Sequence, residues 1–279
     1  MTTHSSKMFD LKGRIVVITG GAGFLGQQHA EAVAEFGAVP VILDLSGSQV
    51  KDVARRITQK YGVKSLGLVV DITSEKQVSQ CCRNVLKKFG RIDVLINNAA
   101  NNPKVESGKG HSNFSRLEKF DLKLWNKDLT VGLTGAFLCS KYFGQVIAQN
   151  QKGGTIINIS SDLGIISPDQ RLYRKKGLPE SQQQVKPVSY SVIKTGLIGL
   201  TRYLATYWAD KNVRCNAICP GGIYNRQNKA FLEKLHQLIP LGRMARPGEY
   251  KGIVVFLASD AASYMNGAVI SIDGGRVIW

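Results

Sequence analysis

The sequence is poor in the residues that hold metal sites and disulfide scaffolds. Among 279 residues there are five cysteines and four histidines, and the cysteines form no CxxC pair. Cysteines this sparse and unevenly spaced do not build a secreted disulfide scaffold, and they lack the ligand spacing of a zinc site. We therefore expect reduced thiols and no bound metal.

Long apolar stretches are also missing. Residues 1–14 are polar and contain no apolar core of the kind that secretory signals carry. The longest apolar runs, near 15–19 and 253–258, are far shorter than the roughly 18 residues that a membrane-spanning helix needs. With 43% hydrophobic residues, however, the chain is too apolar for wholesale disorder. We expect a folded cytoplasmic protein with no membrane partner.

What the sequence does contain is a regular alternation of two kinds of segment. Short β-branched runs predict strands near 15–19, 39–43, 65–70, 92–97, 155–160, 213–218 and 269–272. Between them, apolar residues at helical spacing predict helices near 24–36, 49–60, 75–89, 122–149, 188–209 and 248–258. Strands that alternate with helices form parallel sheets covered on both faces. We predict an α/β fold, a doubly wound seven-stranded parallel sheet, with residues 1–279 as a single Rossmann domain.

A glycine-rich turn, TGGAGFLG at residues 19–26, joins the first predicted strand to the first helix. Gly20 allows a tight turn, Gly23 allows the backbone to approach a pyrophosphate, and Gly26 allows close packing of helix and strand. The amides of Phe24 and Leu25 would then face the phosphates at the helix N-terminus. Such a turn can be purely structural, but its place between strand and helix favours dinucleotide binding.

Acidic residues end the next two predicted strands. Asp44 closes the second strand, 18 residues after Gly26, where a carboxylate can accept hydrogen bonds from adenosine ribose hydroxyls. The same carboxylate would repel a 2′-phosphate, and no Lys or Arg lies between residues 20 and 26 to offset the repulsion. Asp71 and Ile72 end the third strand, where we expect the adenine. Unless Asp44 is only a turn residue, the pattern favours NAD(H) over NADP(H).

A tyrosine and a lysine lie four residues apart in YSVIK, residues 190–194. On a helix this spacing places Tyr190 and Lys194 on one face. A nearby cation stabilises a phenolate, and lowering a tyrosine pKa from about 10 towards 7 needs about 4 kcal/mol. Such a tyrosine could exchange a proton with a substrate oxygen at neutral pH. Taken alone, the pair could equally be an exposed feature of a helix surface.

Four further motifs accompany these two: NNAA at 97–100, ISS at 159–161, PGGI at 220–223 and IDGG at 272–275. In this order the motifs resemble those of the short-chain dehydrogenase/reductase family, from about residue 9 to the C-terminus. The resemblance implies that Tyr190 is the general acid/base, that Lys194 holds the nicotinamide ribose, and that Ser161 hydrogen-bonds the substrate oxygen. Ser161 could instead make a simple strand-end hydrogen bond. The resemblance also places residues of two strand ends around the cofactor: Asn98, Ala99, Pro220, Gly221 and Ile223.

Three positions depart from the family pattern. Phe24 stands where the commonest branch of the family carries its middle glycine, and Gly132 stands where the family has its active-site Asn. Ser161 and Tyr190 are 29 residues apart, about twice the family's usual separation. The extra residues would form an enlarged substrate loop at about 162–187. The glycine at 132 leaves open which group completes the proton relay to Lys194.

Basic residues concentrate in long irregular segments. The formal net charge is +17, and residues 101–127, 171–186 and 219–247 carry +3, +4 and +4 of it. These segments follow predicted strands, so we expect them at the carboxyl edge of the sheet, where such folds bind ligands. The charge could focus an anionic substrate or simply form a solvated surface. Scattered loop positions do not favour nucleic-acid binding.

The sequence therefore predicts an NAD(H)-dependent oxidoreductase, acting on CH–OH donors, that interconverts a secondary alcohol and a ketone. Segments around 161–173 and 185–208 look most like oxidoreductases of flagellin and surface-sugar modification, so the substrate would be a small molecule, an anionic sugar derivative. One alternative is a 3-oxoacyl-thioester reductase. Another, suggested by Gly132, is a dinucleotide-binding regulator or sensor with little turnover. The resemblance also implies a homotetramer or homodimer, packed through helices near 122–149 and 188–209.

Overall fold

Seven short, mostly β-branched strands pair in parallel in a computed structural model that describes residues 7–101 and 114–279. In chain order they are β1 (Ile15–Thr19), β2 (Val39–Asp44), β3 (Leu66–Val69), β4 (Val94–Asn97), β5 (Gly154–Ile159), β6 (Val213–Pro220) and β7 (Val269–Ile272). Their order across the sheet is β3-β2-β1-β4-β5-β6-β7, so the winding reverses between β1 and β4. This is the doubly wound Rossmann sheet that the sequence predicts, in one domain.

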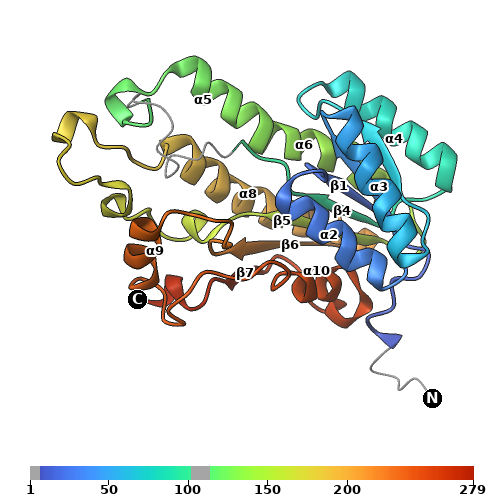
Figure 1. The fold of residues 1–279 in the computed structure, drawn as a ribbon. Helices are drawn as coiled ribbons and strands as arrows, with labels where there is room; N and C mark the ends of the chain where they lie inside the picture. Colours follow the sequence, from blue (N-terminus) through green and yellow to red (C-terminus); the bar gives the residue numbers. More distant parts are fainter. Residues whose placement is uncertain (1–6, 102–113) are drawn as a thin grey trace.

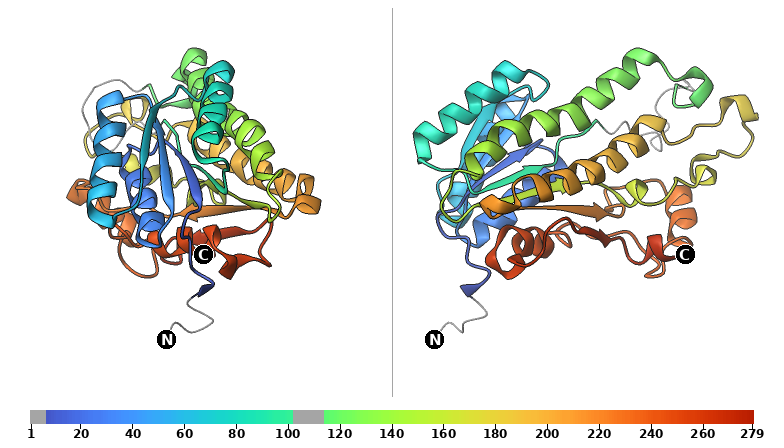
Figure 2. Two further views of the ribbon diagram at one scale, coloured as in Figure 1. Left: turned by 90° about the vertical axis from the view of Figure 1, so that its right-hand side faces the viewer. Right: turned by 180° about the vertical axis from the view of Figure 1, so that it is seen from behind.

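Helices cover both faces of the sheet (Figure 1; Figure 2). One face carries α2 (Phe24–Glu35), α3 (Gly47–Tyr61) and α10 (Lys251–Ala258). The other carries α4 (Glu75–Phe89), α5 (Leu122–Leu129), α6 (Gly135–Cys139), α7 (Gln145–Ile147) and α8 (Val188–Tyr207). Strand side chains alternate between the two layers: Val16 and Ile18 join the first core, whereas Ile15 and Val17 join the second. Burial on both faces explains why these strands are continuously apolar.

The predicted helix at 122–149 is one continuous helical segment, but two π-helical turns divide it. They lie at Thr130–Thr134 and Ser140–Gly144, between α5, α6 and α7. The first π turn contains Gly132, which is buried. Such turns widen a helix locally and occur often at functional sites.

The segment at 219–247, expected to be irregular, contains a helix instead, α9 (Lys229–His236). The Asn228 side chain caps its first turn by accepting a hydrogen bond from the Phe231 N–H, at 2.8 Å. Leu235 is buried against Leu172, and this contact fixes the apolar face of the helix. The capping Asn228 was a signal in the sequence, but Leu172, against which the apolar face packs, lies in another segment.

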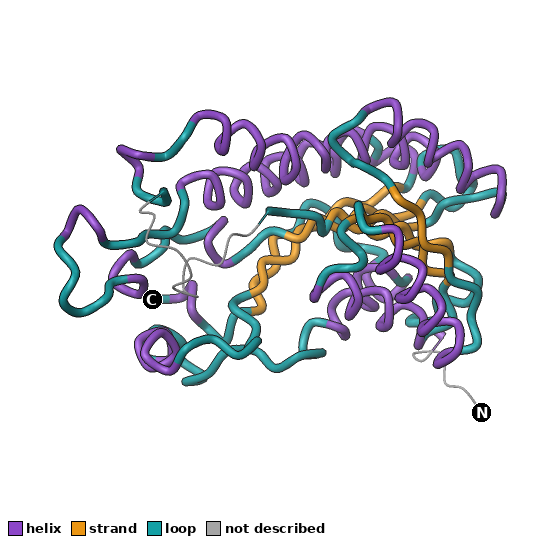
Figure 3. Tube along the Cα trace, turned by 45° about the horizontal axis from the view of Figure 1, so that its top comes forward, coloured by secondary structure: helices purple, strands orange, loops and turns teal. Residues whose placement is uncertain are grey.

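All strands end at one edge of the sheet, at the left of Figure 1, where α9 and the turns of 162–187 extend beyond the strands. Loops gather at this end, as the tube in Figure 3 shows, and the C-terminus lies beside α9. The described chain begins at the opposite side of the molecule, ahead of β1. Across the described ranges, no helix has both the length and the apolar character that a membrane crossing requires.

Candidate active site

A cavity of about 630 Å³ opens at the carboxyl edge of the sheet. It lies over the switch between β1 and β4, which is the usual ligand position in folds of this kind. The predicted site residues that line it come from six strand ends and from α8: Gly20, Gly23, Phe24, Leu25, Asp44, Asp71, Ile72, Asn98, Ala99, Ser161, Tyr190, Lys194, Pro220, Gly221 and Ile223. Gly26 does not line the cavity. Residues far apart in the sequence therefore form one site.

The glycine turn is shaped by close backbone contacts. Gly20 has a positive φ of 59°, and a Cβ atom there would lie 2.9 Å from the Ala99 Cα. A Cβ atom on Gly26 would lie 2.2 Å from the Gly20 carbonyl oxygen, so Gly26 lets α2 pack against the turn. Gly23 precedes α2 and provides no side-chain cap. The first amides of α2 therefore face the cavity in a cradle that fits a pyrophosphate.

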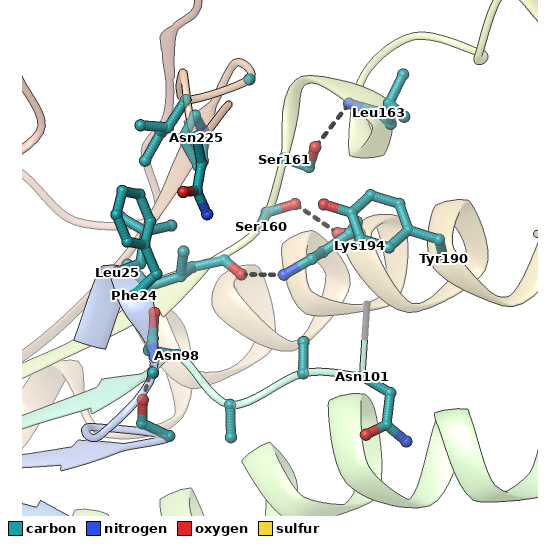
Figure 4. A pocket seen from close by; sticks show the side chains of 18 of the residues that line it. Phe24, Leu25, Asn98, Asn101, Ser160, Ser161, Leu163, Tyr190, Lys194 and Asn225 are labelled. Carbon is teal, nitrogen blue, oxygen red and sulfur yellow. Dashed lines mark hydrogen bonds between the residues drawn. The ribbon is translucent and has the colours of Figure 1, made fainter. Parts of the chain in front are cut away.

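Asn98 fastens the end of β4 to this turn. Its side-chain amide donates to the carbonyl oxygens of Thr19 and Gly20, at 3.0 and 3.1 Å, and its backbone N–H donates to Thr19 Oγ1 at 3.0 Å. Figure 4 shows Asn98 at the base of the cavity, below Phe24 and Leu25. Asn98 thus shapes the cradle, because its amide hydrogens are used within the protein.

Two carboxylates line the end of the cavity where the sequence predicts the adenosine. Asp44 Oδ2 accepts from the Ala22 N–H at 3.0 Å, and its Oδ1 accepts from the Leu45 N–H at 2.8 Å. Asp71 Oδ1 accepts from both the backbone N–H and the hydroxyl of Thr73, at 2.9 and 2.7 Å. These bonds hold both carboxylates in place, and each carboxylate has lone pairs left for a ribose or an adenine.

Tyr190 and Lys194 lie one turn apart on α8, as the spacing predicts. The Lys194 Nζ is 5.7 Å from the centre of the Tyr190 ring and donates to the Ile159 carbonyl oxygen at 2.7 Å. Ser160 Oγ donates to the Lys194 carbonyl oxygen at 2.7 Å and ties α8 to the end of β5. In Figure 4 the Tyr190 hydroxyl points from α8 towards Ser160 and Ser161.

The Lys194 ammonium is in an unusual electrostatic environment. Burial, and to a smaller extent the positive charge of Lys186, lowers the pKa of Lys194 to about 8, whereas Cys219 opposes the shift. A buried cation is costly unless something compensates it, and the acceptor that Lys194 meets among the described residues, the Ile159 carbonyl oxygen, is neutral. A ribose hydroxyl or a phenolate beside Lys194 would therefore stabilise its charged form.

Ser161 makes more than a strand-end hydrogen bond. Its hydroxyl donates to Asp162 Oδ1 at 2.6 Å and accepts from the Leu163 N–H at 3.2 Å. Asp162 in turn pairs with Arg276, whose Nη1 lies 2.8 Å from Asp162 Oδ2, and both side chains are buried. Neither Asp162 nor Arg276 was predicted from the sequence. The signals were weak: an acid directly after the two serines, and an arginine directly after IDGG.

Lys186 was also missed, because it was counted only as one of many loop charges. Its Nζ lies 3.9 Å from the centre of the Tyr190 ring, closer than that of Lys194. Lys186, Lys194 and Arg276 are the cations among the described lining residues, and they lie at the opposite end of the cavity from Asp44. The cavity is thus negative at one end and carries an excess of cations at the other.

The opposite end of the cavity, beyond Tyr190, has an apolar wall. Leu172, Leu235 and Met244 form a buried cluster there. The rings of Tyr173 and Phe231 pack against this cluster, tilted to each other with centres 5.8 Å apart. These residues come from α9, from the segment at 170–173 and from the turn before α10. The two segments that carry the densest charge thus form part of the cavity lining.

Much of the charge in these segments is neutralised locally. Arg171 pairs with Asp169 at 2.7 Å, and Arg174 pairs with Glu180 at 2.8 Å. Arg243 pairs with Glu249 at 2.7 Å. The net charge of the rim therefore overstates the number of cations that a substrate would meet.

A buried polar network lies beside the position of the absent asparagine. Asp128, one turn before Gly132, accepts from the hydroxyl of Ser189 at 2.6 Å and from the side-chain amide of Asn101 at 3.3 Å. Gly132 itself brings no polar group. Among residues 7–101 and 114–279, no three His, Cys, Asp or Glu side chains are grouped so that they could hold a metal ion.

The chain is similar in sequence to known reductases and dehydrogenases. A family model described as enoyl-(acyl carrier protein) reductase matches residues 21–276. The 3-oxoacyl-[acyl-carrier-protein] reductase FabG of Aquifex aeolicus is 34% identical over 269 residues, covering 95% of this chain and 98% of that protein. The NAD-dependent glycerol dehydrogenase of Listeria innocua is 32% identical over 278 residues, covering 98% and 97%.

Solved structures show the same architecture. A short-chain type dehydrogenase/reductase from Mycobacterium marinum superposes with a TM-score of 0.81 at 30% identity, covering 96% of this chain and 97% of that one. A gluconate 5-dehydrogenase from Burkholderia cenocepacia, in complex with NADP and tartrate, gives a TM-score of 0.84 at 26% identity, covering 99% and 100%. These similarities extend over nearly the whole chain.

Proposed function

We propose that this chain, which belongs to the short-chain dehydrogenase/reductase family of oxidoreductases, interconverts a secondary alcohol and a ketone with NAD(H). The observation that carries this proposal is the meeting of Ser161, Tyr190 and Lys194 in one cavity with the glycine cradle. The family's cofactor is a nicotinamide dinucleotide, which supplies the exchange of hydride with the substrate carbon. The protein supplies orientation, charge and proton transfer.

In this proposal Tyr190 moves the proton. Its hydroxyl points into the cavity and would accept the proton of an alcohol, or return one to a ketone, at the phenolic oxygen. The Lys194 ammonium favours the phenolate and offers donors to the ribose hydroxyls. Because the Ser161 hydroxyl hydrogen is held by Asp162, Ser161 offers a lone pair to a substrate hydroxyl and must rotate to donate to a ketone oxygen.

The charges at the nucleotide end support NAD(H). Asp44 lies at the end of β2 beside the start of α2, and no Lys or Arg lines that end of the cavity among the described residues. A 2′-phosphate there would meet a carboxylate without a compensating cation. The Listeria relative is named as NAD-dependent, whereas the Burkholderia structure contains NADP, so relatives alone do not decide the cofactor.

For the substrate we propose an anionic sugar derivative of the kind used in surface-sugar modification. At the end of the cavity that has the apolar wall, three cations (Lys186, Lys194 and Arg276) outnumber one carboxylate, that of Asp162. A similar fold acts on gluconate, an anionic sugar acid, in the Burkholderia protein. A 3-oxoacyl thioester is the second candidate, favoured by the 34% identity to the Aquifex reductase. A sensor with little turnover is the third, favoured by the absence of a polar side chain at Gly132.

We also propose a homodimer or homotetramer in the cytoplasm. Large apolar side chains are exposed on the helices that were expected to pack against a second copy: Leu122, Phe137, Val192, Tyr203 and Tyr207. Burying such a patch against its symmetry mate would remove apolar area from water. The five cysteines are buried and unpaired, which suits a reducing compartment.

The test is a turnover screen with NAD and NADP against gluconate, sugar phosphates, nucleotide sugars, glycerol and acetoacetyl-CoA. We expect Tyr190→Phe to lower turnover at least about 100-fold and Tyr264→Phe, at a fully exposed tyrosine, to leave it unchanged. Full activity of Tyr190→Phe would refute the assigned chemistry. Tight NADH binding with no turnover across the panel would favour the sensor, and turnover of acetoacetyl-CoA alone would favour the thioester reductase.

A further inference from the structure

We infer that Lys186 is a second positioning cation for Tyr190, which stabilises the deprotonated phenol together with Lys194. The inference rests on the proposed function, since it gives Lys186 a role through the proposed acid/base. The family resemblance identified one cation beside Tyr190, four residues after it on α8. The structure places another, four residues before it.

The contact itself carries the inference. The Lys186 Nζ lies 3.9 Å from the centre of the Tyr190 ring, well within the range of a cation–π interaction. A neutral phenol attracts such a cation through the quadrupole of its ring, whereas a phenolate spreads a full negative charge over the same atoms. The attraction therefore grows when Tyr190 loses its proton, and thermodynamic linkage requires the pKa of Tyr190 to fall.

The backbone around Lys186 is built to hold it there. Its backbone N–H donates to the Gln170 Oε1 at 2.9 Å, which ties it to the turn at 170–173. Pro187 follows directly and forms the N-cap position of α8, with φ fixed near its ordinary value. The Cα of Lys186 is thus held at the start of the helix that carries Tyr190. A long side chain from this point reaches back over the ring.

The other charged groups near Tyr190 come from each element packed on this part of α8. Lys194 lies on α8 itself, with its Nζ 5.7 Å from the ring centre. Asp162 follows β5, but Ser161 and Arg276 already donate to its two oxygens. From α5, Asp128 accepts from Asn101 and from Ser189, the residue next to Tyr190.

Cys219 of β6 is the last such group among the described residues, and burial raises the pKa of its thiol, so it is neutral near pH 7. The positive charge of Lys186 also contributes to the lowered pKa of Lys194, which places the two ammonium groups within electrostatic range of each other. Lys186 and Lys194 repel each other beside the neutral phenol, and a phenolate between them would offset this repulsion by attracting both cations. The arrangement therefore favours the ionised tyrosine more than Lys194 alone would.

Titration of Tyr190 tests this without a substrate. Tyrosinate absorbance in the near ultraviolet is followed against pH for the full-length protein and for Tyr190→Phe, and the difference isolates Tyr190. The same difference is measured between Lys186→Met and the Lys186→Met/Tyr190→Phe double variant. We expect Lys186→Met to move the Tyr190 inflection upward by about one pH unit. We expect Lys186→Arg, which keeps the cation, to leave it near the original value.

Two controls make the outcome specific. Lys176→Met removes an exposed lysine of the same segment and should leave the Tyr190 inflection unchanged. Urea unfolding of each variant establishes that it is folded. If Lys186→Met does not fold, the Tyr190 inflection is compared between Lys186→Gln, which removes the charge, and Lys186→Arg, which keeps it. An inflection that does not move in a folded charge-neutral variant overturns the inference.

Kinetics then separates a role through Tyr190 from direct contact with substrate. With the panel compound that turns over fastest, Lys186→Met should shift the pH profile of oxidation upward and lower the rate at pH 7 about tenfold, while the plateau at high pH is retained. A raised KM with an unshifted profile would mean that Lys186 binds the substrate instead, and the inference would be wrong. Full activity of Tyr190→Phe would refute the proposed function, whereas the titration would still report on Lys186.

Discussion

Ile193 occupies the space that a side chain at position 132 would need. A Cβ atom on Gly132 would lie 2.6 Å from the Ile193 Cγ2 atom and 3.3 Å from its Cδ1 atom. Both residues are buried, Gly132 in the first π turn and Ile193 on α8, three residues after Tyr190. The glycine and the β-branched residue therefore fit each other across the two helices. The asparagine that the family carries at this point would collide with the Ile193 side chain.

This contact predicts that side chains at position 132 destabilise the protein. Gly132→Ala should lower the free energy of unfolding by about 1–3 kcal/mol, because the interior is overpacked. Gly199→Ala is the matched control, since it is also in a helix but has no heavy atom near its Cβ position. That control should raise stability by up to about 1 kcal/mol through helix propensity. Urea unfolding of both variants measures the difference.

A compensating substitution sharpens the prediction. Combining Gly132→Ala with Ile193→Ala removes the collision, so the loss should be smaller than the sum of the two single losses. Additive losses in the double variant would mean that Ile193 is not what excludes a side chain at position 132. Gly132→Asn alone should therefore not restore a proton relay, because the Ile193 side chain occupies the space that the asparagine would need.

The sheet could be predicted because its signals are local. The run at Ile15–Thr19 is apolar without a break, and a strand buried on both faces requires this pattern. Gly20 and Gly26 were identified by spacing alone, and the close contacts they make to Ala99 and to each other give the reason. Tyr190 and Lys194 share a helix face, so four residues of spacing were enough to bring them together.

The residues that were missed depend on contacts between distant parts of the chain. Arg276 meets Asp162 across 114 positions, and nothing near either residue indicates the pairing. The role inferred for Lys186 depends on the position of its side chain over the Tyr190 ring, and a count of loop charges does not indicate that position. Likewise α9 was missed because its apolar face is defined by Leu172, which lies in another segment. The relatives described above do not test the similarity to flagellin-modifying enzymes, which stays a prediction.

Asp44 should control the choice between NADH and NADPH. Replacing it with Ser keeps a hydrogen-bond acceptor but removes the charge, so the NADPH affinity should rise about tenfold relative to that of NADH. Fluorescence titration of the two reduced cofactors measures the ratio. Asp71→Asn is the control, because a residue near the adenine should affect both cofactors alike. Tighter binding of NADPH than of NADH by the unaltered protein would contradict the role given to Asp44.

His29 should make stability fall in mild acid. It lies buried in α2, and neither ring nitrogen has a hydrogen-bond partner in the described part of the chain. Burial lowers the pKa of His29 to about 4. Between about pH 6.5 and pH 4 the imidazole is protonated in the unfolded chain but stays neutral in the folded protein. The free energy of unfolding therefore decreases as the pH falls through this range. The loss should reach about 3 kcal/mol at pH 4.

Removing the imidazole should flatten this dependence. His29→Leu should lose most of the slope of unfolding free energy against pH between about 6.5 and 4. His236→Gln, at a partly exposed histidine, should keep the slope. Urea unfolding at a series of pH values measures both. If His29→Leu retains the full slope, the buried imidazole is not the group responsible.

The buried pair between Arg276 and Asp162 should be sensitive to the loss of one partner and tolerant of the loss of both. Arg276→Met leaves a buried carboxylate unpaired and should cost about 3–5 kcal/mol of unfolding free energy. Arg171→Met breaks an exposed pair with Asp169 and should cost no more than about 1 kcal/mol. The Asp162→Leu/Arg276→Met double variant removes both buried charges and should recover much of the loss, because no ion is left desolvated.

The same variants show whether the pair of Asp162 and Arg276 also positions the Ser161 hydroxyl, in addition to stabilising the fold. Asp162 holds the Ser161 hydroxyl hydrogen, so the double variant can be nearly as stable as the original protein and still have a misplaced Ser161. We expect its turnover to fall about tenfold or more while its stability recovers, and we expect NADH affinity to be unchanged, since neither residue lies at the nucleotide end. If turnover recovered together with stability, the pair would serve only the fold, and Ser161 would need no fixed partner.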